Sequence, residues 1–240
     1  GVLAGLFGVG GGLIIVPVLV LSFTSQGMAT EILTHLAVGT SLATIIPTSI
    51  VSMRSHLRKD AVDVTLLKSW GPAIAIGVVI GAVLIGIVEG EVMIGVFAVT
   101  AAAVALHMAF APEGLRLAEQ LPRGVPRFGI GMLIGTISTM MGIGGGTLTV
   151  PTLVLCNYPI RRAVGTASAI GLIIAFPGTV GAVIGGWGSE ELPPWSLGNV
   201  SLIALVILAP ATMLAAPWGA KLAHSIKTRN LRRVFALFLG

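Results

Sequence analysis

Two glycine-rich runs interrupt long apolar stretches of this 240-residue chain. The run GVGGG occupies positions 8–12 and the run GIGGG positions 142–146, 134 residues later, and each leads to a proline, Pro17 or Pro151. Inside a lipid bilayer every backbone N–H and C=O group needs a hydrogen-bond partner, so irregular backbone persists only where protein buries it or where it lines a polar cavity. A matched pair of interrupted segments in the two halves of a chain therefore indicates the substrate site of a transporter.

The composition excludes an ordinary soluble domain. Charged residues make up 10% of the chain and hydrophobic residues 55%, whereas soluble domains are about 25% charged. We therefore predict an all-α polytopic membrane protein with helices of about 20 residues per span. The chain starts with Gly1 in apolar sequence rather than with Met, so we expect that native sequence preceded it or that a signal peptide was removed. Cys156 is the only cysteine, which excludes an internal disulfide.

Three sequence patterns recur in the same order in the two halves. Besides the glycine runs, AVGTS at 37–41 recurs as AVGTA at 163–167, and the GPA and GA pairs at 71–82 recur as APA and GA at 209–220. The spacings are 134, 126 and 138 residues, as expected of a duplication whose loops have changed length. We expect one integrated membrane domain with a first repeat at 1–110, a cytoplasmic polar linker at 111–126 and a second repeat at 127–240.

The placement of charge predicts how the apolar segments cross the membrane. Hydropathy gives segments at about 1–23, 35–53, 66–88, 92–110, 128–157, 162–186, 197–220 and from 231 to the end. If all of them crossed, the basic loops around Arg58 and Arg229 would lie on opposite sides, against the positive-inside rule. If the two glycine-broken segments instead turn back at their glycines, all 14 lysines and arginines lie on the cytoplasmic side.

That arrangement leaves three crossings in each half, an odd number, so the second half must be inserted upside down. The sequence thus predicts an inverted-topology repeat in which each half has one glycine-broken re-entrant segment plus three transmembrane helices. The first glycine turn would enter from outside and the second from inside, and the two would meet near the middle of the membrane.

The composition of the turns predicts an anion site. Glycine lets a ligand approach the backbone closely, and successive N–H groups form an anion-binding concavity. A short helix follows each run, and its N-terminus carries about half a positive charge. The predicted substrate-binding residues are the turn glycines and the hydroxyls of the next repeated motif: Gly10, Gly11, Gly12, Gly144, Gly145, Gly146, Thr40, Ser41, Thr166 and Ser168. Thr147 and Thr149 could add polarity beside the second run.

Other interpretations of the same residues stay open. Glycines in membrane helices often serve close helix packing, and a helical hydroxyl often bonds to a carbonyl of its own helix. A nucleotide-binding loop is disfavoured, because neither run lies between a strand and a helix of a soluble unit. We expect no cofactor and no nucleic-acid partner.

The titratable residues disfavour several other functions. All nine acidic residues lie at predicted span ends or in loops, so no carboxylate is placed as a proton relay or Na⁺ ligand within the membrane. No carboxylate, His or Cys cluster lies at that depth either, which disfavours a metal site and cation transport. An intramembrane enzyme is least favoured, because the nearest nucleophile and base, Ser41 and His35, lack a Gly-x-Ser-x-Gly elbow.

The chain resembles the sulfite exporter TauE/SafE family of membrane permeases. The resemblance is carried by the run GLFGVGGG at 5–12 through Pro17, by its second copy through Pro151 and by the two AVGT segments. The resemblance spans nearly the whole chain. It implies export of sulfite or of organosulfonates such as sulfoacetate. The two copies differ just before the glycine runs: Leu6 and Phe7 precede the first run, and Met140 and Met141 precede the second. This difference could make the two halves of the site unequal.

Together these observations predict a secondary transporter of the inner, cytoplasmic membrane that exports small anions by alternating access. Its partners would be the anionic substrate and membrane lipid, with anionic lipid at the basic cytoplasmic face. An anion channel and an uptake permease for another small anion stay open as alternatives. Small-residue surfaces also leave a homodimer open.

Overall fold

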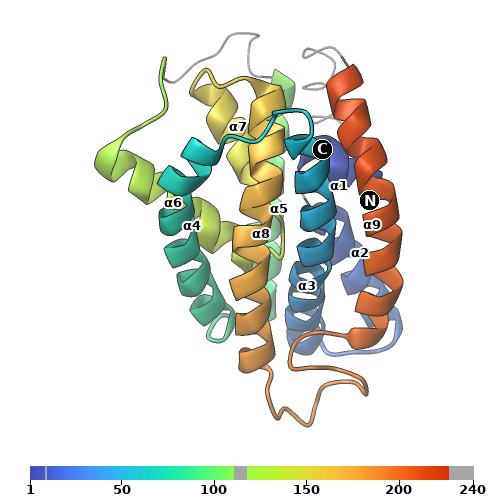
Figure 1. Cartoon of the computed structure of the whole chain (residues 1–240). Coiled ribbons are helices and arrows are strands. Elements are labelled where there is room, and N and C mark those ends of the chain that lie inside the picture. Colours follow the sequence, from blue (N-terminus) through green and yellow to red (C-terminus); the bar gives the residue numbers. More distant parts are fainter. Residues whose placement is uncertain (9, 111–117, 227–240) are drawn as a thin grey trace.

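The structure is a computed structural model that describes residues 1–8, 10–110 and 118–226. Its described residues form helices and no strand (Figure 1). The helices are α1 (Val2–Phe7), α2 (Gly12–Ser25), α3 (Thr30–Leu57), α4 (Val64–Ile85), α5 (Gly90–Phe110), α6 (Gly124–Met140), α7 (Gly146–Leu155), α8 (Ile160–Gly185) and α9 (Leu202–Ser225). The prediction of an all-α protein is confirmed.

Five helices of the described part are long and apolar enough to cross a membrane, namely α3, α4, α5, α8 and α9. They coincide with five of the predicted crossing segments, and the remaining one, from residue 231, lies outside the described residues. Large apolar side chains cover the outside of the bundle: Val99 of α5 is 71% exposed and Leu214 of α9 is 76% exposed. Such a surface suits lipid rather than water, which agrees with a polytopic membrane protein.

Both predicted helix breaks occur at the glycine runs. The backbone of Gly8, Gly10 and Gly11 has positive φ values of 67°, 71° and 96°, which ends α1 and separates it from α2. Gly142, with φ of 64°, lies between α6 and α7. L-amino acids reach this conformation only with strain, whereas glycine reaches it freely, so the glycines are what permit the turns.

The second broken segment returns to the end of the bundle at which it starts. Arg127 in the first turns of α6 and Tyr158 just after α7 line the same cavity, of about 640 Å³, together with Leu66 at the start of α4. The loops that follow α2, α4 and α8 lie at the opposite end (Figure 1). Residues 111–117 of the predicted linker lie outside the described residues, and α6 starts at Gly124, inside the predicted linker and a few residues before the apolar segment expected from about 128.

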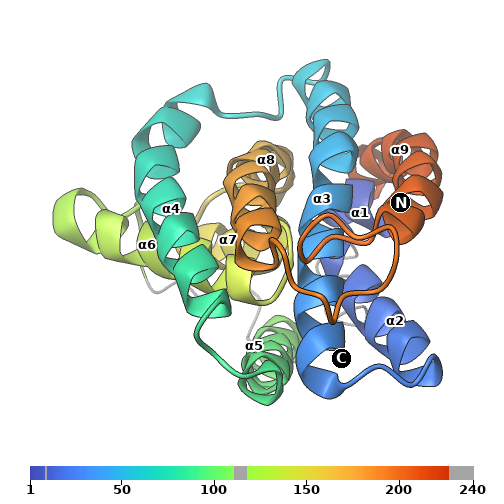
Figure 2. The same cartoon turned by 90° about the horizontal axis from the view of Figure 1, so that it is seen from below.

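The packing of the bundle centres on α3 and α8, which contact each other and are flanked on opposite sides (Figures 1 and 2). Helix α9 packs on α3 and α1 packs on α9, whereas α4 packs on α8 and α6 packs on α4. Exchanging α1 with α6, α3 with α8 and α9 with α4 turns one set of contacts into the other. The pairs of neighbouring helices thus correspond between the two halves of the chain.

The correspondence extends to single residues. A Cβ atom on Gly39 of α3 would overlap the carbonyl oxygen of Asn199, and one on Gly165 of α8 would overlap that of Ala61. Likewise, a Cβ on Gly81 would lie 2.7 Å from the carbonyl oxygen of Thr136, and one on Gly219 would overlap that of Val2. Corresponding positions in these contacts are separated by the spacings of the repeated motifs: 126 residues between Gly39 and Gly165, 134 between Val2 and Thr136, and 138 between Gly81 and Gly219.

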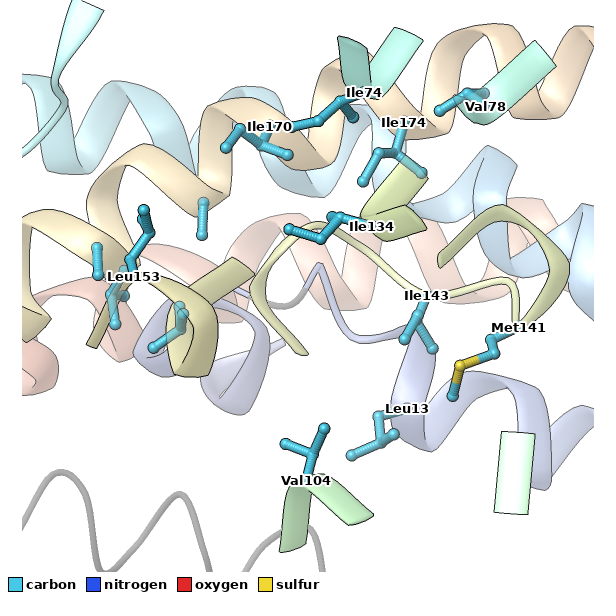
Figure 3. Close-up of a cluster of buried hydrophobic side chains, with 14 of the residues drawn as sticks. Leu13, Ile74, Val78, Val104, Ile134, Met141, Ile143, Leu153, Ile170 and Ile174 are labelled. Carbon is cyan, nitrogen blue, oxygen red and sulfur yellow. The ribbon is translucent and has the colours of Figure 1, made fainter. Parts of the chain in front are cut away.

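Apolar side chains fill the space between these helices. Figure 3 shows Ile170 and Ile174 of α8 beside Ile74 and Val78 of α4. In the same buried cluster, Ile143 of the second turn lies near Leu13 of α2. The core therefore continues across the two glycine turns.

Close backbone contact between α4 and α6 predicts sensitivity to a single methyl group. A Cβ on Gly77 would overlap the carbonyl oxygen of Met132, so Gly77→Ala must push α4 and α6 apart, at a cost of about 1–3 kcal/mol. We expect the melting temperature of the detergent-solubilised protein to fall by several degrees. Gly95→Ala in α5 is the control, because no atom lies within 4 Å of its Cβ position. Equal melting temperatures for the two variants would contradict the packing.

Candidate functional site

The two glycine turns touch each other in the interior. A Cβ on Gly12, the first residue of α2, would overlap the carbonyl oxygen of Gly142 and would lie 2.7 Å from the Cα of Ile143. The hydroxyl of Ser41 on α3 donates to the same Gly142 carbonyl over 2.6 Å. Two segments that are far apart in the sequence are thus joined at their helix breaks, as the repeat predicts they would be.

Each turn rests on the long helix of the opposite half. A Cβ on Gly8 would overlap the carbonyl oxygen of Val164 on α8, and one on Gly142 would lie 2.9 Å from the Cα of Val38 on α3. Val38 and Val164 are corresponding residues of the repeated AVGT motif. The glycines therefore serve close packing as well as the turn itself, which was one of the two interpretations of the sequence.

The structure gives two of the predicted hydroxyls a role in holding helix starts. The Oγ1 of Thr40 accepts from the backbone N–H of Ser201, and the Oγ1 of Thr166 accepts from that of Asp63, each over 2.9 Å. Ser201 and Asp63 are the N-caps of α9 and α4, and their own side chains accept from the first turn of these helices. Thr40 and Thr166 thus fix corresponding helices in the two halves.

The other two predicted hydroxyls also have partners within the protein. Ser41 bonds to Gly142, as described above, and its counterpart in the second repeat is Ala167, which has no hydroxyl. Ser168 donates to the Val164 carbonyl one turn earlier over 3.1 Å and lies 3.2 Å from the hydroxyl of Ser52. All four predicted side chains are buried, and each has at least one hydrogen-bonding role that involves no ligand.

A different set of buried hydroxyls has no hydrogen-bond partner within the protein. Four of its members flank the second turn or face it from α3: Ser49, Ser138, Thr147 and Thr149. The sequence pointed to Thr147 and Thr149 only as added polarity, and it did not single out Ser49 or Ser138. A position-by-position comparison of the two repeats would have singled out the two threonines, because Thr147 and Thr149 replace the apolar Leu13 and Ile15 of the first copy.

Charged side chains gather at the end of the bundle where α4 and α6 start. Tyr158 donates from its Oη to Asp63 over 2.6 Å, and Arg162 lies 3.9 Å from the same carboxylate. The hydrogen bond from Tyr158 is the main cause of the lowered pKa of Asp63. The pKa of Tyr158 is raised to about 12, first by burial and second by its hydrogen bond to the Asp63 carboxylate. Arg123 and Arg127 line the cavity beside this pair.

Within the described part of the chain, no group of three or more His, Cys, Asp or Glu residues could hold a metal ion. Buried hydroxyls and the N–H groups of a helix start lie beside the second turn. Helices α2 and α7, which start at the turns, contain no charged residue. Such a site can bind a small polar or anionic group without a fixed positive charge.

Comparisons with known proteins agree with these features. The family model described as "Sulfite exporter TauE/SafE" matches residues 1–240. A probable membrane transporter protein of Haemophilus influenzae is 31% identical over 239 residues, covering 100% of this chain and 90% of its own length. Probable membrane transporter proteins of Methanocaldococcus jannaschii and Bacillus subtilis are each 25% identical, covering 100% of this chain and 88% and 90% of their own lengths. No solved structure matches.

The Asp63 contact predicts a dependence of stability on pH. Because folding lowers the pKa of Asp63, its charge stabilises the folded protein above the unfolded pKa of about 4, and this contribution is lost as the pH falls through the folded pKa. Asp63→Asn should therefore melt a few degrees below the unsubstituted protein at neutral pH, and the gap should close in acid.

Melting curves from pH 7 to pH 3 would test this expectation, with Glu191→Gln in the exposed α8–α9 loop as the control. A gap that stays constant with pH would show that the Asp63 charge does not contribute.

Proposed function

Because the chain belongs to the sulfite exporter TauE/SafE family, we propose that it exports small sulfur-containing anions, such as sulfite or an organosulfonate, across the cytoplasmic membrane. The broader statement rests on the family and on its relatives: the chain is a multi-pass membrane transporter with five apolar candidate spans in its described part. The observation that carries the substrate proposal is the buried contact between the two glycine turns at Gly12 and Gly142.

The proposed site uses the start of a helix from each half. Helix α2 begins at Gly12 and α7 begins at Gly146, and the N–H groups of a first helical turn have no acceptor within their own helix. Two such helix ends attract an anion through the helix dipole and offer hydrogen bonds. The turn glycines, with the four hydroxyls on α3 and α8, are the proposed binding residues: Gly10, Gly11, Gly12, Gly144, Gly145, Gly146, Thr40, Ser41, Thr166 and Ser168.

Alternating access is proposed to come from movement of the outer helices about α3 and α8. Helix α1 packs on α9, and α6 packs on α4, so each outer unit combines a broken segment of one half with a long helix of the other. The bonds of Thr40 to Ser201 and of Thr166 to Asp63 join these outer units to the central pair. Inverted halves would give the inward-open and outward-open states equivalent contacts.

The proposed inverted topology places the two ends of the bundle on opposite sides of the membrane. Gln26 follows α2 at one end and Arg161 starts α8 at the other, and both side chains are exposed. In a Cys156→Ser background, we expect Gln26→Cys to react with a membrane-impermeant thiol reagent added outside intact cells. Arg161→Cys should react only after the membrane is permeabilised. The opposite pattern, or labelling of both from outside, would overturn the topology.

Transport itself is predicted to be measurable as efflux of labelled sulfite and sulfoacetate from proteoliposomes, with sulfate and a divalent cation for comparison. We expect saturable loss of the sulfur anion and counterflow, which separate a carrier from a channel. Gly11→Ala, at the turn with φ of 96°, should reduce the flux at least tenfold because it strains the turn.

Gly27→Ala is the matched control, because Gly27 also has a positive φ, of 77°, but lies in the α2–α3 loop with no atom within 4 Å of its Cβ position. Equal flux through the two variants would show that the turn at Gly11 is not part of the transport site. No flux of any sulfur anion through the unsubstituted protein would overturn the proposed function.

A further inference from the structure

Buried hydroxyls without a partner are concentrated around the second glycine turn. Ser49, Thr147 and Thr149 are each at most 1% exposed, and none has a hydrogen-bond partner within the protein. A buried polar group that lacks a partner costs free energy, and native proteins contain few of them. Several in one region therefore call for a functional explanation.

Ser49 lies beside the start of α7. A Cβ atom on Gly171 of α8 would lie 2.8 Å from the Oγ of Ser49 and 3.6 Å from the backbone N of Gly145, the N-cap of α7. The Ser49 hydroxyl from α3 and the start of α7 thus both lie beside Gly171 of α8, where a side chain at position 171 would press against the hydroxyl. Helix α7 also packs on α8.

The start of α7 supplies further donors. The helix has ten residues, and the N–H groups of its first turn have no acceptor within the helix. Thr147 is the second residue of that turn, so its hydroxyl belongs to the same helix end. A backbone N–H and a serine or threonine hydroxyl are the donors that bind oxyanion oxygens when no cation is present.

The corresponding surroundings of the start of α2 do not offer the same chemistry. At the spacing of the repeat, Thr147 corresponds to Leu13 and Ser49 corresponds to Ala175. Leu13 and Ala175 are both buried, and neither side chain can form a hydrogen bond. The donors are therefore gathered on the α7 side rather than shared equally by the two turns.

We propose that Ser49, Thr147 and the N-terminus of α7 at Gly145 form an oxyanion subsite that takes one singly charged oxyanion group, a sulfonate or hydrogensulfite, in preference to doubly charged sulfate. This inference rests on the proposed function and makes its substrate class more specific. Helices α2 and α7 contain no Lys or Arg that could compensate a second charge. Since the cost of burying an ion rises steeply with its charge, hydroxyls and one helix end bind a singly charged group more readily than a doubly charged one.

The probes are methanesulfonate, a monoanion, and sulfate, a dianion, each titrated as a competitor of labelled sulfite efflux from proteoliposomes. We expect methanesulfonate to compete at a concentration at least tenfold below that needed for sulfate. Ser49→Ala and Thr147→Val should each weaken methanesulfonate competition by about tenfold, because each removes one hydrogen bond to a charged ligand.

The matched control is Thr152→Val on the same helix, whose hydroxyl is already bonded to the Leu148 carbonyl over 2.7 Å. It should leave the competition by methanesulfonate unchanged. A second measurement separates binding from folding: without ligand, Ser49→Ala should melt no lower than the unsubstituted protein, because its hydroxyl bonds to nothing in the protein.

Three results would overturn the subsite while leaving the proposed function intact. These are equal competition by sulfate and methanesulfonate, unchanged competition in both hydroxyl variants, and a loss of competition that is matched by an equal loss in Thr152→Val. A fall in the ligand-free melting temperature of Ser49→Ala would assign that hydroxyl to folding and overturn its role. Absence of sulfite flux through the unsubstituted protein would overturn the proposed function instead.

Discussion

Close approach of one backbone to another at glycine is the contact on which this structure depends. Inside a bilayer, helices gain little from hiding apolar side chains from one another, so their association relies on tight van der Waals packing. Gly39 and Gly165 let the central helices α3 and α8 meet the segments before α9 and α4, and Gly12 lets α2 meet the second turn. Without these contacts the broken helices would leave backbone groups unpaired in the interior.

The fold could largely be predicted from the sequence, because its signals are local. A run of about 20 apolar residues predicts a span, and a triple glycine predicts a break at that point. Five helices long and apolar enough to cross, and both breaks, accordingly lie where the sequence predicted them. The matching contacts at Gly39 and Gly165 support the repeat, while the orientation of its halves in the membrane stays a prediction.

The hydroxyl partners could not be predicted in the same way, because they depend on residues far away in the chain. Thr40 bonds to Ser201 and Thr166 bonds to Asp63, and no local pattern around either threonine indicates such a partner. Conversely, Ser49 looks like any serine of an apolar helix, and only its surroundings beside Gly145 and Gly171 distinguish it. Sequence reasoning therefore found the turns but not which hydroxyls near them are unpartnered.

The backbone contacts of the two halves correspond to each other, whereas their polar side chains do not. The correspondence of the backbone contacts suits two states of similar energy. The polar groups do not correspond: α4 starts at a carboxylate held by Tyr158, where α9 starts at the neutral Ser201. Thr147 likewise replaces Leu13. A duplicated backbone can thus keep the contacts that the proposed movement requires, while substitutions in one copy alone concentrate the unpartnered hydroxyls of the proposed subsite beside α7.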